Sequence, residues 1–425
     1  MANSRASNAS HYCGIDFGTS NSTVALATES GHFLATLENA DQSIPSAIFF
    51  NSTNGRAVFG RAAIADYLSG ENGRFMRALK SVIGRPLFHE KTRIEKRDVT
   101  LADILSLFLR HLKTTAERQT GHEVGKVVLG RPVQFIEDSP DLDSQAQRDL
   151  EQAARKIGFE HIEFQFEPIA AALEYEISVA GEQVVLVADI GGGTSDFSIV
   201  RVAPEKINAP DRTQDILANR GIRVGGTDFD QQLSMKHIMP HLGRGSIYGA
   251  KNLEMPTWIY MDLSTWSNVN FVYEHKTVSE IRSLRREAKK PKLLDRLLSV
   301  VEHQSGHRLI GDVEQAKIAL SGDDKAVLDL AYIESDLSLP VSPKNFEASI
   351  SGLVRRVEDC IATTVTDAAV PAGQINTVFM TGGSSMVRPI QTLIRRLFPA
   401  AAIVSGDVFG AVGKGLGLDA KRKFG

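Results

Sequence analysis

The sequence predicts an α/β protein built from two related lobes, and three observations lead to this fold class. Short apolar runs such as KVVLGRPV from Lys126 and VVLVADI from Val184 have the composition of strands that are covered on both faces of a sheet. Amphipathic segments alternate with such runs, which is typical of α/β layers. In addition, GIDFGTSNSTVAL from Gly14 and VADIGGGTSDFSIV from Val187 share one construction, which indicates two equivalent units.

Length and composition narrow the class of protein. The chain of 425 residues exceeds the ~250–300 residues at which a single hydrophobic core stops growing. Its contents of 42% hydrophobic and 23% charged residues are typical of soluble globular proteins. A formal net charge of -3 provides no general attraction to nucleic acid or to an anionic membrane.

The compartment is predicted from the cysteines and from the absence of targeting signals. Cys13 and Cys360 are too few for a disulfide framework or a cysteine metal cluster, and they fit a reducing compartment. The N-terminal MANSRASNAS lacks the apolar core of a signal peptide, and no run of about 18 apolar residues occurs. We therefore expect a cytoplasmic protein with neither membrane nor nucleic acid as a partner.

Three helices are predicted from apolar residues at helical spacing. One covers residues 144–157 and ends at Gly158. A longer one covers residues 344–365 directly after Pro343, and another covers residues 387–398 directly before Pro399.

The two repeated segments have the pattern of phosphate-binding turns. In each, an apolar strand delivers an aspartate, and a turn of glycine and hydroxyl side chains follows. Backbone N–H groups in a concave turn bind phosphate well, and glycine allows the close approach that this requires. The expected phosphate contacts are Gly18, Thr19, Ser20 and Asn21 in the first turn, and Gly191, Gly192 and Gly193 in the second. A tight structural turn would explain either segment alone, whereas the occurrence of these turns together favours phosphate binding.

The aspartates of these segments suggest a metal ion. Mg²⁺ prefers a few carboxylates together with waters and phosphate oxygens, so Asp16 and Asp189 are its expected ligands. Asp196 follows directly after the second turn. A third glycine turn, in VFMTGGSSMV from Val378, precedes a predicted helix and is expected to approach adenine, ribose or phosphate through Gly382, Gly383 and Ser384.

Together these three turns resemble the phosphate-1, phosphate-2 and adenosine motifs of the actin, hexokinase and heat-shock chaperone ATPase superfamily. Further segments resemble the seventy-kilodalton heat-shock (DnaK-type) branch. RFMRALKSVIGR is similar to the segment that carries the catalytic lysine, EPIAAALEY to the hinge motif, VGGTDFDQQL to LGGEDFD, and VEQAKIALS to the helix that holds the nucleoside. The resemblance covers roughly residues 12–420. Because the chain ends soon after GAVGKGLGL, it is most similar to the short YegD-like branch, which lacks a peptide clamp.

The resemblance implies a two-lobed actin-like ATPase fold. Each lobe is then a ribonuclease-H-like mixed sheet flanked by helices, with a smaller subdomain inserted. We expect the first lobe over residues 11–181 with its insert at about 41–121, and the second over 182–404 with its insert at about 229–320. A C-terminal helix within 405–425 is expected to return to the first lobe.

The resemblance also implies an activity and its residues. ATP or ADP is expected with Mg²⁺, together with slow hydrolysis of ATP and a lobe rotation that a protein client or co-chaperone reads. Lys80 takes the place of the catalytic lysine, which stabilises the γ-phosphate or positions the attacking water, and Glu167 that of the hinge glutamate. Further catalytic candidates are Asp189, Thr194 and Asp196. The implied nucleoside contacts are Gly225, Gly226, Glu314, Lys317 and Ser321.

Three positions depart from the family pattern. Ile318 and Met386 stand where the family has arginines near adenine, and Thr227 replaces the glutamate of GGEDFD. Two alternatives therefore stay open. A sugar or small-molecule kinase of the same fold would need an acceptor pocket and a carboxylate base, for which no motif is present. A non-catalytic nucleotide-gated scaffold would be consistent with Ile318 and Met386.

The remaining signals favour structural roles. Two histidine pairs, 237/241 and 303/307, have i, i+4 spacing, but no nearby acid completes a metal motif and we expect surface histidines. The basic stretch from Arg282 is predicted to be a solvated helix face. Trp258 and Trp266 are expected in a core, within a segment longer than the family needs, and both cysteines are expected to be buried.

Overall fold

The computed structural model describes residues 12–28, 31–94, 97–136, 139–209, 211–405 and 410–425. The chain packs into two compact units. Unit 1 consists of Met1–Arg223, Cys360–Ser385 and Arg395–Gly425, and unit 2 consists of Val224–Asp359 and Met386–Ile394.

The first large sheet of unit 1 is mixed. Its strand order is β11-β10-β1-β2-β3, with β4 also paired to β2. Strand β10 runs parallel to β1, whereas β2 is antiparallel to it and pairs Asp16 with Thr23. The strands are β1 (Tyr12–Phe17), β2 (Asn21–Thr28), β3 (Gly31–Leu34), β4 (Ser43–Pro45), β10 (Lys126–Arg131) and β11 (His161–Phe166).

The second large sheet repeats this construction. Its strand order is β14-β13-β12-β19-β20, and β13 is antiparallel to β12 while β19 is parallel to it. The pairing places Asp189 opposite Asp196. The strands are β12 (Gln183–Ile190), β13 (Ser195–Val202), β14 (Ile216–Ile222), β19 (Thr377–Thr381) and β20 (Ala402–Ser405). The predicted repetition of a strand, a glycine turn and an antiparallel strand is confirmed.

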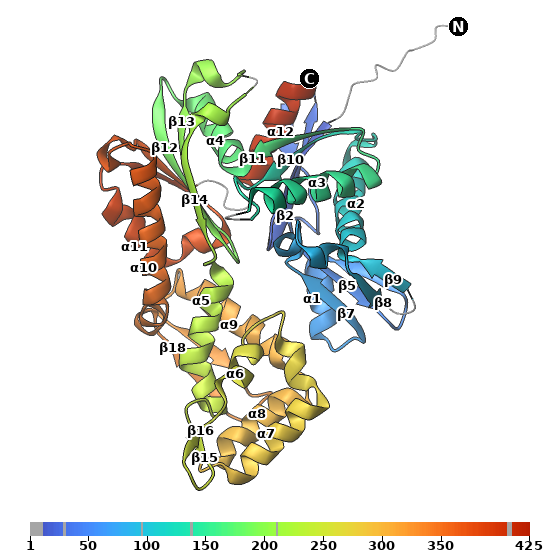
Figure 1. Cartoon of the computed structure of the whole chain (residues 1–425), viewed down its shortest axis with the longest axis vertical. Coiled ribbons are helices and arrows are strands. Elements are labelled where there is room, and N and C mark those ends of the chain that lie inside the picture. The colour runs from blue at the N-terminus through green and yellow to red at the C-terminus, as the bar shows by residue number, and fades with distance from the viewer. Residues whose placement is uncertain (1–11, 29–30, 95–96, 137–138, 210, 406–409) are drawn as a thin grey trace. The chain divides into compact units, whose positions relative to one another are not determined.

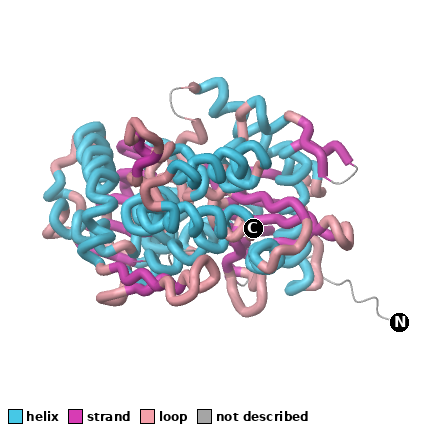
Figure 2. Tube along the Cα trace, turned by 90° about the horizontal axis from the view of Figure 1, so that it is seen from below, coloured by secondary structure: helices cyan, strands magenta, loops and turns pink. Residues whose placement is uncertain are grey.

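Two cores hold unit 1 together. Helices α2 (Leu101–Thr120) and α3 (Pro140–Lys156) contribute to a core with residues of β1, β2 and β10. Helices α4 (Glu167–Ser178) and α12 (Ala411–Phe424) form a second core with residues of both large sheets. Figure 1 draws α12 in red beside β10 and β11, and Figure 2 shows the helical C-terminal end next to strands.

Small residues allow α12 to pack this closely. A Cβ added at Gly415 would lie 1.8 Å from Ala170 O in α4, and one at Gly14 would lie 2.3 Å from Leu416 C in α12. Atoms cannot approach to such distances, so glycine is required at both positions. The strand, α4 and α12 are therefore held at one fixed spacing.

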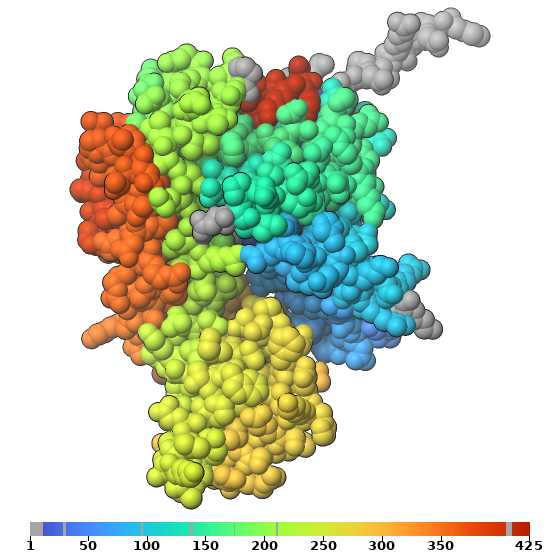
Figure 3. All heavy atoms as spheres, in the orientation of Figure 1, coloured from blue at the N-terminus to red at the C-terminus, as the bar shows by residue number. Residues whose placement is uncertain are grey.

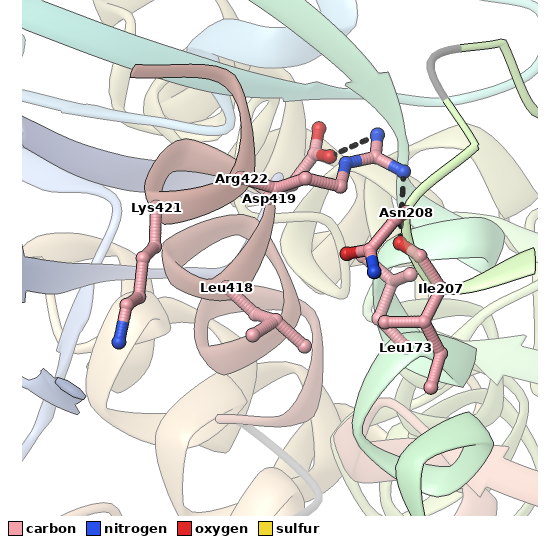
Figure 4. A pocket seen from close by; sticks show the side chains of 7 residues that line it. All are labelled: Leu173, Ile207, Asn208, Leu418, Asp419, Lys421 and Arg422. Atoms are coloured by element: carbon pink, nitrogen blue, oxygen red, sulfur yellow. Dashed lines mark hydrogen bonds and ion pairs between the residues drawn. The ribbon is translucent and has the colours of Figure 1, made fainter. Parts of the chain in front are cut away.

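A cavity of about 290 Å³ lies beside α12. Arg422 reaches across it and donates to Ile207 O at 3.2 Å while pairing with Asp419 (Figure 4). Its lining is formed by Leu173, Ile207, Asn208, Leu418, Asp419, Lys421 and Arg422. None of these residues belongs to a predicted site.

Smaller elements complete unit 1. The three-stranded sheet has the order β6-β5-β7, and β8 and β9 form a hairpin. Two 3₁₀ turns, η1 and η2, follow β7. The elements are β5 (Ala47–Asn51), β6 (Arg56–Phe59), α1 (Gly60–Leu68), β7 (Gly73–Arg77), η1 (Leu79–Val82), η2 (Pro86–His89), β8 (Lys91–Ile94), β9 (Arg97–Thr100), η3 (Pro204–Lys206), η4 (Thr213–Asp215) and η8 (Ala372–Gln374).

Unit 2 is mainly helical. Its two sheets are the two-stranded pairs β15-β16 and β17-β18. Two helices continue from unit 2 into unit 1, namely α10 (Pro343–Asp367) and α11 (Arg388–Leu397). The other elements are α5 (Gly226–Leu233), η5 (Ser234–Ile238), η6 (Met239–Leu242), β15 (Ile247–Tyr248), β16 (Leu253–Glu254), α6 (Thr257–Leu263), η7 (Val269–Tyr273), α7 (His275–Glu287), α8 (Pro291–Glu302), α9 (Gly306–Leu320), β17 (Ala326–Asp329) and β18 (Ser338–Val341).

The predicted helices are present with shifted boundaries. Helix α3 begins at Pro140, earlier than predicted, because proline is well suited to the first helical position. Its C-terminal Gly158 has a φ of 95°, in the left-handed region that glycine tolerates. The basic stretch from Arg282 forms two helices rather than one, since Pro291 begins α8. Within it, exposed Arg282 and Arg285 pair with Glu302 and Asp295.

Predictions for individual side chains had mixed outcomes. Both cysteines are buried and free, as predicted. Trp258 is 41% exposed, so the prediction of a core position is wrong for it. His307 is only 4% exposed, so the prediction of a surface histidine is wrong there. The reason is tertiary: Trp266 lies against the His307 ring, with centroids 5.0 Å apart, and local spacing does not reveal such a contact.

In the described part of the chain, no helix combines the length and apolar composition needed to cross a membrane.

The buried His307 should make unit 2 less stable in mild acid. Burial lowers its pKa to about 4, and a hydrogen bond with the Trp266 backbone opposes this shift only partly. The unfolded chain, in which histidine has a pKa of about 6.5, binds an extra proton at pH values between these two pKa values. Stability therefore rises with pH across this window and falls as pH drops, by about 1 to 2 kcal/mol between pH 7 and pH 5.

Urea unfolding followed by tryptophan fluorescence tests this, because both tryptophans lie in unit 2. Titration at pH 7 and pH 5 is compared between the unmodified protein and His307→Phe, which cannot titrate. The expected result is a smaller loss of stability for the variant. Equal losses in the two proteins would contradict the assignment.

Candidate active site

The first glycine turn joins β1 to β2 in unit 1. A Cβ added at Gly18 would lie 2.2 Å from Asn21 O, so only glycine fits the start of the turn. Ser46 holds the turn from behind: its Oγ donates to Gly18 O at 2.7 Å, and its N donates to Ser20 O at 2.8 Å. Ser46 therefore supports the turn through carbonyl oxygens of Gly18 and Ser20, and these contacts do not use the backbone N–H groups of the turn.

The second glycine turn joins β12 to β13 and lies against the first. Gly191 N donates to Thr194 O at 2.9 Å, which closes the turn. A Cβ added at Gly192 would lie 2.0 Å from Ser20 Oγ, and one at Gly193 would lie 3.8 Å from Thr19 Cγ2. The two predicted phosphate turns, which are far apart in sequence, are thus in direct contact.

The third glycine turn follows β19 and packs on the second. Gly382 has a φ of 79°, and a Cβ there would lie 2.4 Å from Ile190 O and 2.5 Å from Asp189 Oδ1. Ser384 Oγ donates to Gly191 O at 2.9 Å. A 3₁₀ turn, η9 (Gly383–Met386), comes before α11, so the helix does not begin directly at the glycines.

An ion pair lies beside these turns. Lys80 Nζ donates to Glu167 Oε1 at 2.6 Å, and the two side chains are 13% and 12% exposed. Burial lowers the pKa of Lys80, but Glu167 and Asp16 outweigh this, so its pKa is raised above the usual value. The lysine is therefore a permanent positive charge at neutral pH.

Three aspartates surround this pair. Burial raises the pKa of Asp16 to about 8, with Glu167 adding to the effect and Lys80 opposing it. Burial and Glu167 raise the pKa of Asp189 to about 6. Burial and Asp189 raise the pKa of Asp196 to about 7, while a hydrogen bond with Thr194 opposes the shift. Four carboxylates thus interact around one ammonium group, which leaves the cluster short of positive charge.

The glycine turns and the charged cluster agree with a comparison of the sequence with known protein families. A family model described as Hsp70 protein matches residues 12–252 and 281–420. The chain belongs to the Hsp70 family. Hsp70 proteins are ATPases that use ATP and ADP, typically with Mg²⁺, so this chain is a nucleotide-binding, chaperone-like protein with the two-lobed actin-like ATPase fold.

The match leaves out residues 253–280 of this Hsp70-family chain. This range holds α6, η7 and the beginning of α7, and it includes both tryptophans. It contains the segment that was expected to be longer than the family needs.

The cluster of unit 1 fits a nucleotide with a divalent cation. The glycine turns place backbone at close range without side chains, as phosphate oxygens require. Burial and the repulsion from Glu167 raise the pKa values of Asp16 and Asp189, and a nearby cation would offset both effects. Among the described residues, no group of three or more His, Cys, Asp or Glu side chains is arranged to hold a metal ion by itself. Mg²⁺ commonly keeps several waters and uses phosphate oxygens as ligands.

The nucleoside residues expected from the Hsp70 resemblance lie in unit 2. Glu314, Lys317 and Ser321 follow one face of α9 and its C-terminal end. Lys317 is buried, and its Nζ donates to Asp230 Oδ2 at 2.8 Å and to Gly226 O at 3.3 Å. The lysine therefore ties α9 to α5, where Gly225 N donates to Asp228 Oδ2 at 2.8 Å.

Two of the three departures from the Hsp70 pattern are exposed apolar side chains. Ile318 is 54% exposed and Met386 is 42% exposed. Arg388 does not replace the missing guanidinium groups, because it is bound to the end of α9. Its Nε donates to Ser321 O at 3.2 Å, and it pairs with Asp324 at 3.3 Å.

Two supporting residues were missed by the sequence prediction. Ser46 is 2% exposed and lies 26 positions after Ser20 in sequence, so only the pairing of β4 with β2 reveals its contact. Asp230 partners Lys317 and stands two residues after Asp228 in the motif VGGTDFDQQL, which was a usable signal.

We predict that Gly382→Ala destabilises unit 1 by about 2 kcal/mol or more, since a Cβ would combine a left-handed φ with overlap on Ile190 O. Gly373→Ala is the matched control in the same unit, because a Cβ there meets nothing within 4 Å. Urea unfolding followed by circular dichroism measures both. The control should stay within about 0.5 kcal/mol of the unmodified protein. Similar stabilities for the two variants would refute the close packing of the third turn.

Proposed function

We propose that this chain hydrolyses ATP slowly in the presence of Mg²⁺ and acts as a nucleotide-dependent switch. One observation carries the proposal: two glycine turns touch each other at Gly192 and Ser20, beside a lysine within a group of partly buried carboxylates. Hydrolysis of a phosphoanhydride needs positioned phosphates, neutralised charge and an oriented water more than covalent chemistry. The residues of unit 1 are proposed to position the phosphates and to orient the water, and Mg²⁺ is proposed to supply the missing positive charge.

The backbone of the two turns is proposed to hold the β- and γ-phosphates. The proposed contacts are Gly18, Thr19, Ser20, Asn21, Gly191, Gly192 and Gly193. When bound, Mg²⁺ would neutralise phosphate charge, and Asp16 and Asp189 are the residues proposed to hold it through its hydration shell. The third turn, at Gly382, Gly383 and Ser384, supports the second turn and is proposed to approach the nucleotide.

Lys80 is proposed to stabilise charge on the γ-phosphate or to orient the attacking water. Its pairing with Glu167 at 2.6 Å supports this role, because the carboxylate fixes the ammonium group and keeps it charged. Glu167 is proposed to sense the water as well. Thr194 and Asp196 are linked by a hydrogen bond and are proposed as further residues that contact the attacking water.

Base and ribose are proposed to contact residues of unit 2, namely Gly225, Gly226, Glu314, Lys317 and Ser321. Lys317 and Gly226 are joined directly, which supports a common role. The exposed Ile318 and Met386 would offer the base an apolar contact in place of the cation–π interaction that arginine makes. Weaker binding of adenine nucleotides is expected from this change.

The second part of the proposal concerns the switch function. Hydrolysis is proposed to rotate one lobe, residues 11–181, against the other, residues 182–404, with a partner reading the change. The partner would be a protein client or co-chaperone in the cytoplasm. Membership of the YegD-like branch of the family is proposed from the sequence resemblance.

The test is hydrolysis of Mg-ATP by the purified protein with no other substrate. Lys80→Ala should lower turnover by on the order of 100-fold or more, because one positioned charge is lost from the transition state. ATP binding, measured by calorimetry, should change only a few-fold. Equal loss of binding and turnover would contradict the role of Lys80.

Lys113→Ala serves as the matched control. Lys113 is also a buried lysine of unit 1 paired with a glutamate, Glu117, at 2.9 Å, but it lies in α2. Its loss should leave turnover unchanged. Tight ATP binding without turnover in any of these proteins would instead favour the scaffold, or a kinase that lacks its acceptor, and a screen of sugars and small molecules would separate those two.

A further inference from the structure

The segment that carries Lys80 is anchored to helix α3 by one buried carboxylate. The Asp149 side chain is 0% exposed, and its Oδ2 accepts a hydrogen bond from Gly84 N at 3.1 Å. Its Oδ1 accepts from Gln145 Nε2 at 2.7 Å and lies 3.1 Å from His89 Nε2. Two of these three partners belong to residues 78–89. Figure 3 shows this part of the chain, in light blue, next to the blue-green surface of α3.

Apart from Asp149, the buried side chains of helix α3 are apolar, namely Ala146, Leu150, Ala153 and Ala154. A buried carboxylate is unfavourable unless it is hydrogen-bonded, and Gln145 is its partner within the helix. Beyond its hydrogen bond within the helix, Asp149 therefore contributes the contacts to Gly84 and His89. Charge-assisted hydrogen bonds of this kind are strong and directional.

A continuous series of turns connects Gly84 to Lys80. Ala78 O accepts from Ser81 N at 3.1 Å and from Ser81 Oγ at 2.8 Å. Lys80 O accepts from Ile83 N at 3.4 Å, and the next turn is closed by Arg85 N, which donates to Val82 O at 3.2 Å. A displacement of Gly84 is consequently passed to the backbone of Lys80.

The backbone at both ends of this series is in the left-handed region. Ala78 has a φ of 60°, which is strained for a residue with a side chain, and Gly84 has a φ of 76°. A Cβ at Gly84 would lie 2.7 Å from Ala146 Cβ and 2.7 Å from Leu142 O, so the segment is seated directly on α3. A strained turn keeps its geometry only when the surrounding contacts hold it.

We propose that Asp149 is a positioning residue for Lys80. Its carboxylate fixes the Gly84 amide, and thereby the turn that holds the Lys80 ammonium group against Glu167. The residue does not touch the nucleotide. This inference rests on the proposed role of Lys80 in ATP hydrolysis.

The kinetic test compares three variants. Asp149→Ala removes the anchor, Asp149→Asn keeps one acceptor for Gly84 N, and Leu150→Val is a destabilising control, since Leu150 is 1% exposed in the same helix. Asp149→Ala should lower kcat by about 10- to 100-fold, because a small misplacement of a catalytic group costs this much. KM and the Kd for ATP should stay within about twofold, and Asp149→Asn should retain part of the activity. Leu150→Val should lower stability but leave kcat unchanged.

A second measurement does not depend on activity. Modification of lysines by an acylating reagent is quantified by peptide mass spectrometry, with Lys317 as the internal reference, because its side chain is 10% exposed and that of Lys80 is 13% exposed. Asp149→Ala should raise the rate at Lys80 several-fold and leave Lys317 unchanged. An unchanged rate at Lys80, or an unchanged kcat in an active enzyme, would overturn the proposal. If the unmodified protein does not hydrolyse ATP, the proposed function fails, and the labelling alone decides whether Asp149 holds the Lys80 turn.

Discussion

The structure of unit 1 depends on an electrostatic constraint: four carboxylates interact around one ammonium group. Lys80 and Glu167 form the close pair, and Asp16, Asp189 and Asp196 add charge that burial makes costly. Groups of this kind repel one another unless a cation and ordered hydrogen bonds compensate. Such an arrangement is unfavourable for stability alone, and clusters of ionisable groups with perturbed pKa values are typical of functional sites. The remaining architecture serves to bring these side chains together and to hold them there.

The two large sheets deliver the acids, and their shared core decides where the acids meet. Both hairpins end a strand in aspartate and turn on glycine. Tyr12 and Val128 from the first sheet and Val185 and Val187 from the second pack in one core with α4 and α12. Glycines at the crossing of α12 with β1 and α4 let these elements approach closely. Burial of this core thus sets the distance between two turns that touch through Gly192 and Ser20.

Support from outside the turns is as important as the turns themselves. Ser46 holds the first turn through Gly18 and Ser20, Ser384 holds the second through Gly191, and Asp149 holds the Lys80 segment through Gly84. Each supporting side chain makes its contact through a backbone amide or carbonyl group. The positions of the two turns and of the Lys80 segment are therefore controlled by hydrogen bonds from residues outside them.

Local sequence determined the elements of this protein and the chemistry of its turns. Strand periodicity, the aspartates at strand ends and the glycine turns are local properties, because backbone conformation and close approach depend on neighbouring residues. The family resemblance then indicated Lys80 and Glu167. Tertiary structure decided which distant segments meet: the contact of Gly192 with Ser20, the support from Ser46, the partnership of Lys317 with Asp230 and the burial of His307 against Trp266. These contacts follow from how the cores pack, and packing is a property of the whole chain that no local pattern contains.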